Sequence, residues 1–325
     1  MSKAIKVHAH GGPEALSYED HDPGKPGPGQ VLVRHTAIGL NFLDTYYRSG
    51  LYPAPNGLPL VPGSEAAGKV LELGEGVEGL NRGDRVAYAT PLGAYSEERV
   101  VPADRLVKVP DGVSDEQAAA MMLKGMTAQY LLHRTFKVKA GDTILCHAAA
   151  GGVGLILGQW AKHLGATAIG TAGSPDKVEL ARAHGYDHVI NYREQDFVAE
   201  VKRITDGKLC DVVYDSVGKD TYMGSLDCLR PLGLFACFGQ SSGPIPPFDL
   251  SILARKGSLF ATRPTLFVYV ARREDLEASA AALFDVVSSG AVKIRINQRY
   301  ALKDAARAHA DLESRRTSGA TILVP

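Results

Sequence analysis

The sequence lacks the features that mark several classes of protein. Its 325 residues include only four cysteines, and no two of them form a C-x-x-C pair. Neither a disulfide framework nor a cysteine-rich metal cluster is therefore expected, and reduced, buried cysteines are the simplest interpretation. No apolar run approaches the roughly 20 residues that span a bilayer. No secretory signal precedes the first strand-like residues, so we expect a cytoplasmic protein without a membrane partner.

The chain also lacks an excess of charge of either sign. Lysine plus arginine equals aspartate plus glutamate, at 36 residues each. A neutral balance gives no broad electrostatic attraction to nucleic acid or to an acidic membrane surface. The composition therefore argues against nucleic acid as a partner.

Two hydrophobic patterns divide the sequence into three regions. Residues 1–122 contain short apolar runs between Gly- and Pro-rich turns, which is typical of a compact β-rich domain. Residues 123–262 alternate between strands and helices. Residues 263–325 predict a helix ending at Gly290, a strand, a second helix over 303–313 and a last strand over 320–324. We expect this tail to return to the first domain.

The alternating region predicts six strands. They are expected at residues 143–147, 168–171, 188–190, 211–214, 234–238 and 258–261, with helices between them, for example over 176–183 and 196–205. Such alternation is typical of a parallel sheet with helices on both faces. Six strands fit a Rossmann sheet. The predicted fold class is therefore α/β, a doubly wound parallel sheet plus a β-rich domain.

A glycine turn follows the first of these strands. Residues 147–154 read HAAAGGVG, so that Ala149 stands where the usual G-x-G-x-x-G motif begins with glycine. A helix N-terminus after such a turn offers backbone N–H groups to a pyrophosphate. We expect Gly151, Gly152 and Val153 to contact a dinucleotide, Gly154 to let the helix pack closely, and Ala149 to have a negative φ.

The end of the second strand indicates which dinucleotide binds. Enzymes that use NAD place a carboxylate there for the ribose hydroxyl, but residues 171–174 read TAGS and contain none. Ser174 offers a short hydroxyl and Lys177 a cation, and both suit a 2′-phosphate. The sequence therefore predicts NADPH rather than NADH.

Small and polar residues follow the other strands at the same expected edge of the sheet. Ligands of open α/β sheets bind outside the carboxyl ends of the strands, so these residues are further candidates for the cofactor site. The candidates are Gly173, Tyr192, Ser216, Val217, Phe238, Gly239 and Ser241.

Taken in order, these stretches resemble the medium-chain dehydrogenase/reductase superfamily. Within it, the chain is similar to the zinc-free NADPH:quinone oxidoreductases of the zeta-crystallin-like branch, of bacterial type. The matching stretches span nearly the whole chain. They are GLNFLDTYYRSGLYP, PGSEAAGKVLELGEGV, GDRVAY, HAAAGGVG, VINYRE, VVYDSVG, CFGQSSG and TRPTL. The resemblance implies a GroES-like catalytic domain over residues 1–122 and hydride transfer from NADPH to a quinone.

The resemblance also implies that no metal takes part. Zinc-containing members carry a Cys where this sequence has Asn41 and a His where it has Ser64, and the cysteine-rich lobe expected near residues 90–110 is missing. Zinc needs nitrogen or sulfur ligands in a nearly complete set. A zinc alcohol dehydrogenase mechanism is therefore not expected.

Other site residues follow from the resemblance. Phe42 to Tyr46 are implied to touch the nicotinamide end of the cofactor. Asn41 is expected to bond either the cofactor ribose or an oxygen of the acceptor, and Tyr46 and Tyr52 offer flat faces and phenol donors. The candidate catalytic residues are Asn41, Tyr46, Tyr52 and Arg263. Further implied cofactor contacts are Asp44, Thr127, Tyr130, Thr265, Leu266 and Arg315, with the choice between Arg315 and Arg316 left open.

Two alternatives remain open at this point. An NADPH-dependent alkenal or enone reductase would use the same residues. A non-catalytic NADPH-binding protein, with an RNA-binding or crystallin-like role, is the rival from another class. The apolar sixth strand, GSLFAT, is expected at the edge of the Rossmann sheet, where two copies would pair to form a homodimer. The sequence does not indicate which quinone is reduced.

Overall fold

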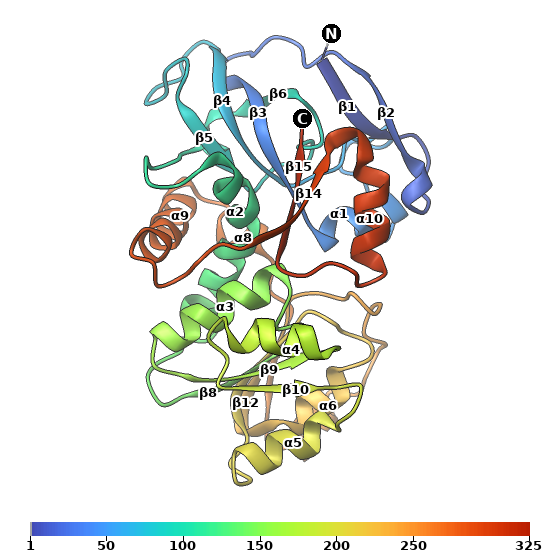
Figure 1. The fold of residues 1–325 in the computed structure, drawn as a ribbon, viewed down its shortest axis with the longest axis vertical. Helices are drawn as coiled ribbons and strands as arrows, with labels where there is room; N and C mark the ends of the chain where they lie inside the picture. The colour runs from blue at the N-terminus through green and yellow to red at the C-terminus, as the bar shows by residue number, and fades with distance from the viewer. Residues whose placement is uncertain (1) are drawn as a thin grey trace. The chain divides into compact units, whose positions relative to one another are not determined.

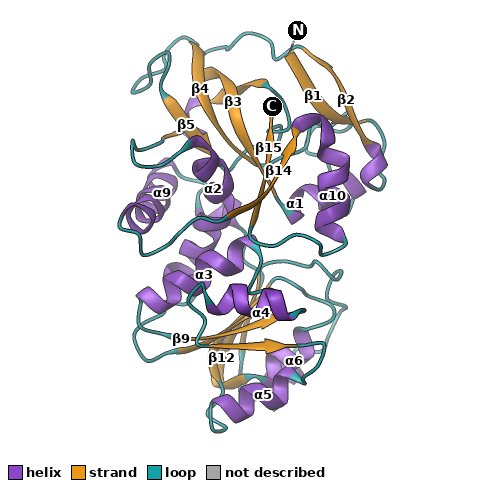
Figure 2. Cartoon of the chain, viewed as in Figure 1, coloured by secondary structure: helices purple, strands orange, loops and turns teal. Residues whose placement is uncertain are grey.

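A computed structural model describes residues 2–325 (Figure 1). Its contacts divide the chain into two compact units. Unit 1 consists of residues 2–124, Val270–Ser288 and Ile294–Pro325, and unit 2 of Gly125–Tyr269 and Ser289–Lys293. The expected domain limits after residues 122 and 262 stay a prediction. Figure 2 shows strands and helices in both units.

Unit 1 is built mainly from strands. They are β1 (Ser2–Val7), β2 (Leu16–His21), β3 (Gln30–Leu40), β4 (Glu65–Leu73), β5 (Arg85–Tyr88), β6 (Glu98–Pro102), β7 (Val107–Lys108), β14 (Ile296–Ala301) and β15 (Ala320–Val324). The main sheet has the order β14-β15-β3-β4-β5-β7, β6 also pairs with β3, and β1 and β2 form a separate antiparallel pair. In the tail, β15 pairs antiparallel with β3.

The longest strand, β3, explains how this sheet forms its core. Val31 and Val33 alternate with more exposed neighbours, as expected of a strand with one buried face. The valines pack with Tyr88 and Leu323, among other buried residues, in a single hydrophobic cluster.

Helices of unit 1 begin at well-defined caps. Asn41 and Asp44 form a capping box at the start of α1 (Phe42–Ser49), and Gly50, with φ of 79°, ends this helix in the left-handed conformation. Helix α2 (Asp115–Tyr130) begins where Ser114 and Gln117 exchange backbone-to-side-chain hydrogen bonds. The other helices are α9 (Arg273–Ser288), α10 (Ala305–Glu313) and three single 3₁₀ turns, η1 (Pro13–Ala15), η2 (Ala103–Arg105) and η4 (Leu302–Asp304).

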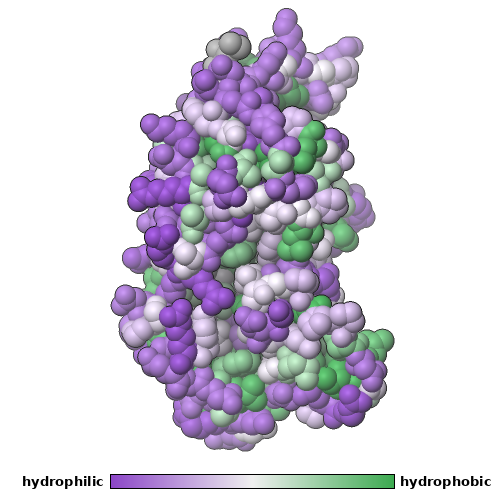
Figure 3. Space-filling view, turned by 90° about the vertical axis from the view of Figure 1, so that its right-hand side faces the viewer, coloured by the Kyte–Doolittle hydropathy of each residue, from purple (hydrophilic) through white to green (hydrophobic). Residues whose placement is uncertain are grey.

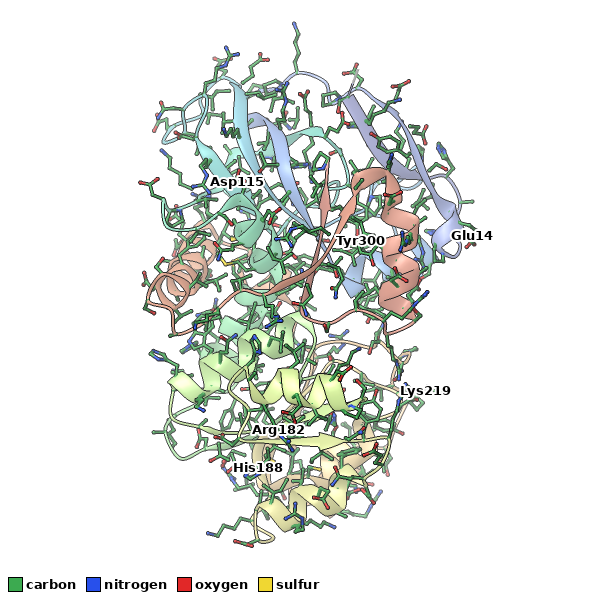
Figure 4. The ribbon with its side chains drawn as sticks, in the orientation of Figure 1. Glu14, Asp115, Arg182, His188, Lys219 and Tyr300 are labelled. Atoms are coloured by element: carbon green, nitrogen blue, oxygen red, sulfur yellow. The ribbon has the colours of Figure 1, made fainter. Side chains whose placement is uncertain are left out.

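Asp115, labelled in Figure 4, ties the first turn of α2 to the sheet of unit 1. Its carboxylate accepts hydrogen bonds from Thr36 Oγ1 at 2.8 Å and from Arg85 Nε at 2.7 Å. Thr36 lies on β3 and Arg85 on β5, so one side chain fixes the helix against two strands.

Unit 2 contains the six predicted strands. They are β8 (Thr143–Cys146), β9 (Thr167–Ala172), β10 (His188–Asn191), β11 (Cys210–Asp215), β12 (Leu229–Cys237) and β13 (Phe260–Thr262). They form one parallel sheet in the order β10-β9-β8-β11-β12-β13. This is the strand order of a Rossmann sheet, and it confirms the predicted fold class. The strand order reverses between β8 and β11.

Helices cover both faces of this sheet, as predicted. Figure 1 shows α3 (Gly152–His163) and α4 (Pro175–Arg182) on one side, and α5 (Phe197–Ile204) and α6 (Tyr222–Asp227) on the other. The unit also contains α7 (Ser251–Arg255), α8 (Leu266–Tyr269) and the π-helix η3 (Leu131–Thr135), which continues α2.

The buried and exposed surfaces agree with the composition. All four cysteines are free and buried, as the sequence predicts. Hydrophilic residues cover most of the face drawn in Figure 3, and hydrophobic ones form separate groups. Among residues 2–325, every helix is too short or too polar to cross a membrane.

Candidate functional site

Most predicted cofactor residues of unit 2 lie just beyond the carboxyl ends of its parallel strands. Because parallel strands point the same way, the segments that follow them share one edge of the sheet. The structure therefore brings these segments together. They contain Gly151, Gly152 and Val153 after β8, Gly173, Ser174 and Lys177 after β9, Tyr192 after β10, Ser216 and Val217 after β11, Phe238, Gly239 and Ser241 after β12, and Arg263, Thr265 and Leu266 after β13.

The glycine turn forms the centre of this edge. Gly151 is the extended N-cap of α3, and no side chain caps the helix, so its first N–H groups are available to an anion. Gly154 must be glycine, because a Cβ there would lie 2.5 Å from the carbonyl oxygen of Ala148 and 2.6 Å from that of Ala149. The turn therefore offers a helix N-terminus that a diphosphate can approach.

The unusual backbone conformation of this turn lies one residue before Ala149, the position at which the sequence departs from the usual glycine motif. Ala149 is absent from the residues with positive φ, as expected, but Ala148 has a φ of 54°. A side chain in this region costs about 1–2 kcal/mol. The strained residue is exposed and its carbonyl accepts a hydrogen bond from Gly151 N–H at 2.9 Å.

A buried polar network, which the sequence did not predict, links residues next to the turn. His147 Nδ1 is 2.9 Å from Thr171 Oγ1, and His147 Nε2 is 2.9 Å from Ser225 Oγ. Ser225 Oγ in turn donates to Asp215 Oδ2 at 2.8 Å. Burial lowers the pKa of His147. The neutral ring therefore joins the ends of β8, β9 and β11.

Asp215 also shapes the loop that follows β11. Its Oδ1 accepts hydrogen bonds from the N–H groups of Val217 at 2.8 Å and Gly218 at 2.9 Å. The Ser216 carbonyl accepts from Ser241 N–H at 3.1 Å. The predicted segments after β11 and β12 are thus held against each other through backbone groups.

The proposed 2′-phosphate residues lie at the start of α4. Ser174 is its N-cap in an extended conformation, and its side chain caps no backbone group. Lys177 lies in the first turn of the same helix. Tyr192 reaches across from the end of β10, because a Cβ on Gly173 would lie 2.4 Å from the Tyr192 hydroxyl oxygen. The structure therefore gathers Gly173, Ser174, Lys177 and Tyr192.

Tyr130 and Arg263 lie in a second group of unit 2. The Tyr130 ring stacks on Tyr269 with centroids 4.3 Å apart, and Arg134 lies over the same Tyr269 ring at 5.1 Å. Arg263 Nη1 donates to the Cys237 carbonyl at 3.2 Å. Thr127 and Tyr130 are both largely buried, so most of the Tyr130 ring serves as packing surface.

In unit 1, Asn41 lies in a buried polar cluster. Its Nδ2 donates to Glu65 Oε1 at 2.9 Å and to the Gly39 carbonyl at 3.4 Å. Glu65 is fully buried and also accepts from Leu123 N–H at 2.6 Å and from the ammonium of Lys124. Four separate elements, β3, α1, β4 and α2, thus meet around one carboxylate.

A second carboxylate, Asp44, lies on the other side of Asn41. Asp44 Oδ2 accepts from Asn41 N–H and from the Tyr95 hydroxyl, each at 2.9 Å. Tyr95 Oη is 3.0 Å from His309 Nε2, and Arg48 Nη1 is 3.0 Å from His309 Nδ1. Burial raises the pKa of Asp44 to about 7 and lowers the pKa of His309 to about 3. Asp44 therefore holds Asn41 in place through a hydrogen bond from the Asn41 backbone N–H.

The predicted aromatic residues gather around α1. Tyr46 lies 6.1 Å from Phe42 and 5.3 Å from Tyr52, measured between ring centroids. Their role as contacts for a flat acceptor stays a prediction. Arg315 follows α10 in unit 1 with a φ of 61°, whereas Arg316 pairs with Asp311 at 3.0 Å. The assignment of a cofactor contact to Arg315 also stays a prediction.

Sequence reasoning missed Glu65, Lys124, His147 and Asp215 as members of these networks. The sequence could have predicted a buried ion pair for Lys124, because it is the one charged residue within the apolar stretch AAAMMLKGM and such a lysine needs a buried partner. Across the described residues, no group of three or more His, Cys, Asp or Glu side chains is arranged to hold a metal ion.

Comparison with known proteins extends this description. The model of the alcohol dehydrogenase GroES-like domain matches residues 27–111, and that of the zinc-binding dehydrogenase matches residues 152–284. A quinone oxidoreductase of Pseudomonas aeruginosa is 56% identical over 326 residues, which cover 100% of both chains. A 2-haloacrylate reductase of Burkholderia is 49% identical over 100% of this chain and 99% of its own.

A solved structure agrees with these matches. The crystal structure of Escherichia coli quinone oxidoreductase complexed with NADPH has a TM-score of 0.97 and 50% sequence identity, covering 99% of this chain and 100% of that chain. Similarity of this extent over the full length establishes the family. The chain belongs to the quinone oxidoreductase family of the medium-chain dehydrogenase/reductase superfamily.

Proposed function

We propose that this protein is an NADPH-dependent quinone reductase that works by hydride transfer without a metal. The observation that carries the proposal is the match, over the full length, to quinone oxidoreductases, one of which is solved with NADPH. The uncapped N-terminus of α3 and the acid-free end of β9 give it physical support.

The residues of unit 2 fit this cofactor. The first N–H groups of α3, at Gly152 and Val153, would hold the diphosphate, because the turn leaves them without a side-chain cap. Ser174 and Lys177 would bind the 2′-phosphate through a hydroxyl and a cation. Gly173 and Tyr192 would border the adenosine. Bound NADPH supplies the hydride.

Residues of unit 1 would hold the nicotinamide end and the acceptor. Asn41 is fixed by Glu65 and by Asp44 before any ligand arrives, so its position does not have to be ordered on binding. Tyr46 and Tyr52 would present ring faces to a flat acceptor. With Asn41 and Ser64 where zinc-containing members have Cys and His, the chain offers no nitrogen or sulfur ligands there.

The cofactor assignment is tested by the double substitution Ser174→Ala, Lys177→Ala. Loss of charge-assisted hydrogen bonds, worth about 1.5–3 kcal/mol, should raise the KM for NADPH at least tenfold and reduce the preference over NADH. Lys208→Ala, at an exposed position of the same unit, is the control and should leave both unchanged. A preference for NADPH that survives the double substitution would contradict the assignment.

A second activity has support from one relative. The similarity to a 2-haloacrylate reductase favours reduction of an electron-poor carbon–carbon double bond as the alternative. NADPH oxidation with benzoquinones, alkenals and 2-haloacrylates, followed by absorbance, separates the two. Turnover of the unsaturated compounds alone would replace the quinone assignment. Tight, salt-sensitive RNA binding without any turnover would favour the non-catalytic alternative instead.

We further propose a cytoplasmic homodimer. Strand β13 lies at the edge of its sheet, and Phe260 on it is 60% exposed. Pairing of two such edges would cover the exposed ring and extend the sheet. Sedimentation should therefore give twice the mass of the chain, and a clean monomer at micromolar concentration would reject the dimer. Four free cysteines agree with a reducing compartment.

A further inference from the structure

The surroundings of Asn41 fix which way its amide faces. Its Nδ2 points at Glu65 Oε1 and at the Gly39 carbonyl oxygen. Neither a carboxylate nor a carbonyl can donate a hydrogen bond. The reversed amide would put its oxygen against two acceptors inside a buried site, which costs at least an unmade hydrogen bond and a repulsion. One orientation is therefore imposed.

Other donors also hold the Glu65 carboxylate, which is fully buried. The ammonium of Lys124, with only 6% of its side chain exposed, contacts Oε1, and Leu123 N–H donates to Oε2 at 2.6 Å. Both carboxylate oxygens therefore face donors and act as acceptors.

Close packing surrounds the carboxylate at Gly39. A Cβ on Gly39 would lie 2.3 Å from Glu65 Oε1 and 2.3 Å from the Ala119 carbonyl oxygen. Strand β3 and helix α2 therefore approach each other closely beside Glu65 Oε1. Its negative charge stays next to the amide nitrogen of Asn41.

The consequence for Asn41 is chemical. Both hydrogens of its amide are directed to protein acceptors, so a ligand can bond this side chain only at Oδ1, which accepts a hydrogen bond. We propose that Glu65 and Lys124 are positioning residues that make Asn41 a hydrogen-bond acceptor only. On the proposed function, Asn41 then receives a hydrogen bond from an O–H or N–H group of the bound dinucleotide. It does not donate to the oxygen of the reduced quinone.

This proposal chooses between the two roles that the sequence left open for Asn41. It is tested by exchanging the two partners. Asn41→Asp places a second carboxylate against Glu65. The double variant Asn41→Asp, Glu65→Gln restores the hydrogen bond with its direction reversed, from the new amide at position 65 to the new carboxylate at position 41. The net charge beside Lys124 is unchanged, but its ammonium, which contacts the same oxygen Oε1 that the new amide nitrogen replaces, has to turn to the new carboxylate at position 41. In both variants residue 41 has no amide hydrogens.

The measurements are the NADPH dissociation constant by fluorescence titration, kcat with a benzoquinone, and thermal stability without cofactor. We expect Asn41→Asp to raise the dissociation constant at least tenfold and to lower the melting temperature. The double variant should return the dissociation constant and kcat to within threefold of the original protein. Asn56→Asp, at an exposed position of unit 1, is the control and should change none of the three.

Several outcomes would overturn the proposal. If the double variant binds NADPH normally but keeps a low kcat, Asn41 is needed as a donor to the acceptor. If Asn41→Asp binds NADPH as the original protein does, the direction of the amide does not matter. If the thermal stability of the double variant stays as low as that of the single one, Glu65 does not hold residue 41 through this bond.

Two further measurements apply if a variant does not fold or if the protein does not bind NADPH. Should Asn41→Asp fail to fold, Glu65→Gln alone provides the test, because a glutamine at this position can present either oxygen or nitrogen and lets the Asn41 amide turn. The NADPH dissociation constant should then rise at least threefold, and an unchanged constant would contradict the proposal. If the original protein binds no NADPH, the proposed function is wrong. The difference in thermal stability between the single and the double variant would still test the hydrogen bond.

Discussion

The two units prepare for a ligand in different ways. In unit 2 the groups offered are mainly backbone groups, at the N-terminus of α3 and in the loops after β11 and β12. The buried side chains of His147 and Asp215 hold these loops in place. In unit 1 the offered group is a side chain, Asn41, and charged side chains from other strands and helices hold it.

This difference has a physical reason. A diphosphate carries charge on several oxygens and is bound well by a row of N–H groups, for which glycine is the main requirement. A single hydrogen bond to a ligand hydroxyl or amide needs one atom in one place. That demands a rigid side chain with satisfied neighbours, which an ionised carboxylate and its lysine provide.

The largest effect is expected from breaking the backbone site. Gly154→Val puts a side chain where even a Cβ would lie 2.5 Å from the Ala148 carbonyl oxygen. The turn must open, and NADPH binding should weaken at least about 1,000-fold, equivalent to about 4 kcal/mol. Fluorescence titration measures this effect.

The matched control for that substitution is Gly112→Val, at a glycine with open space around its Cβ position. It should bind NADPH as the original protein does. Normal binding by the Gly154 variant would show that α3 does not hold the diphosphate, and the contrast between the two units would lose its basis.

A smaller effect is expected from the charged network of unit 1. Burial raises the pKa of Asp44 from 3.8 to about 7, so the folded protein holds a proton that the unfolded chain releases. Stability contributed by the protonated form is complete at low pH and is lost as the pH rises from about 4 to 7. At about 1.4 kcal/mol per pKa unit, the loss is about 4 kcal/mol.

Asp44→Asn removes this dependence, because the amide can accept from Tyr95 and donate towards Ser64 without titrating. The free energy of unfolding is measured between pH 4 and 8. Up to pH 7, the value for the original protein should fall relative to that of the variant, and above pH 7 the two curves should run parallel. His309 titrates in both proteins, so it cancels in the comparison. Asp285→Asn, at an exposed position, is the control. Parallel curves for the original protein and Asp44→Asn would contradict a raised pKa.

The smallest effect is expected from relieving the strain in the turn. Ala148→Gly removes a side chain at a φ of 54° and should stabilise the protein by about 1 kcal/mol or less, because glycine also gains entropy in the unfolded chain. The NADPH dissociation constant should change less than twofold. Ala150→Gly, at a neighbouring residue without positive φ, should instead destabilise. A melting temperature that falls in both variants would show that Ala148 is not strained.

The same contrast explains what the sequence could predict. The six strands of unit 2 were predicted because buried parallel strands form continuous apolar runs, and the turn because its glycines are consecutive in the chain. Ser174 and Lys177 could be proposed because their assignment depends only on the residues that follow one strand. These features are local, so spacing alone exposes them.

The networks of unit 1 are not local. Glu65 lies 24 residues from Asn41, Lys124 lies 59 residues from Glu65, and His309 lies 214 residues from Tyr95. No spacing rule links such residues, and only the packing of strands and helices in the folded unit brings them together. The positive φ of Ala148 could not be predicted either, because alanine rarely adopts that conformation and no sequence pattern indicates it.

The position of β15 in the sheet sets the order in which the chain can fold during synthesis. This strand lies between β14 and β3, so the central pairing of unit 1 joins residues near 40 to residues near 322. All six strands of unit 2 are synthesised before residue 263. The Rossmann sheet can therefore assemble on a growing chain, whereas residues 38–40 of β3, next to Asn41, lack their partner until β15 has been synthesised.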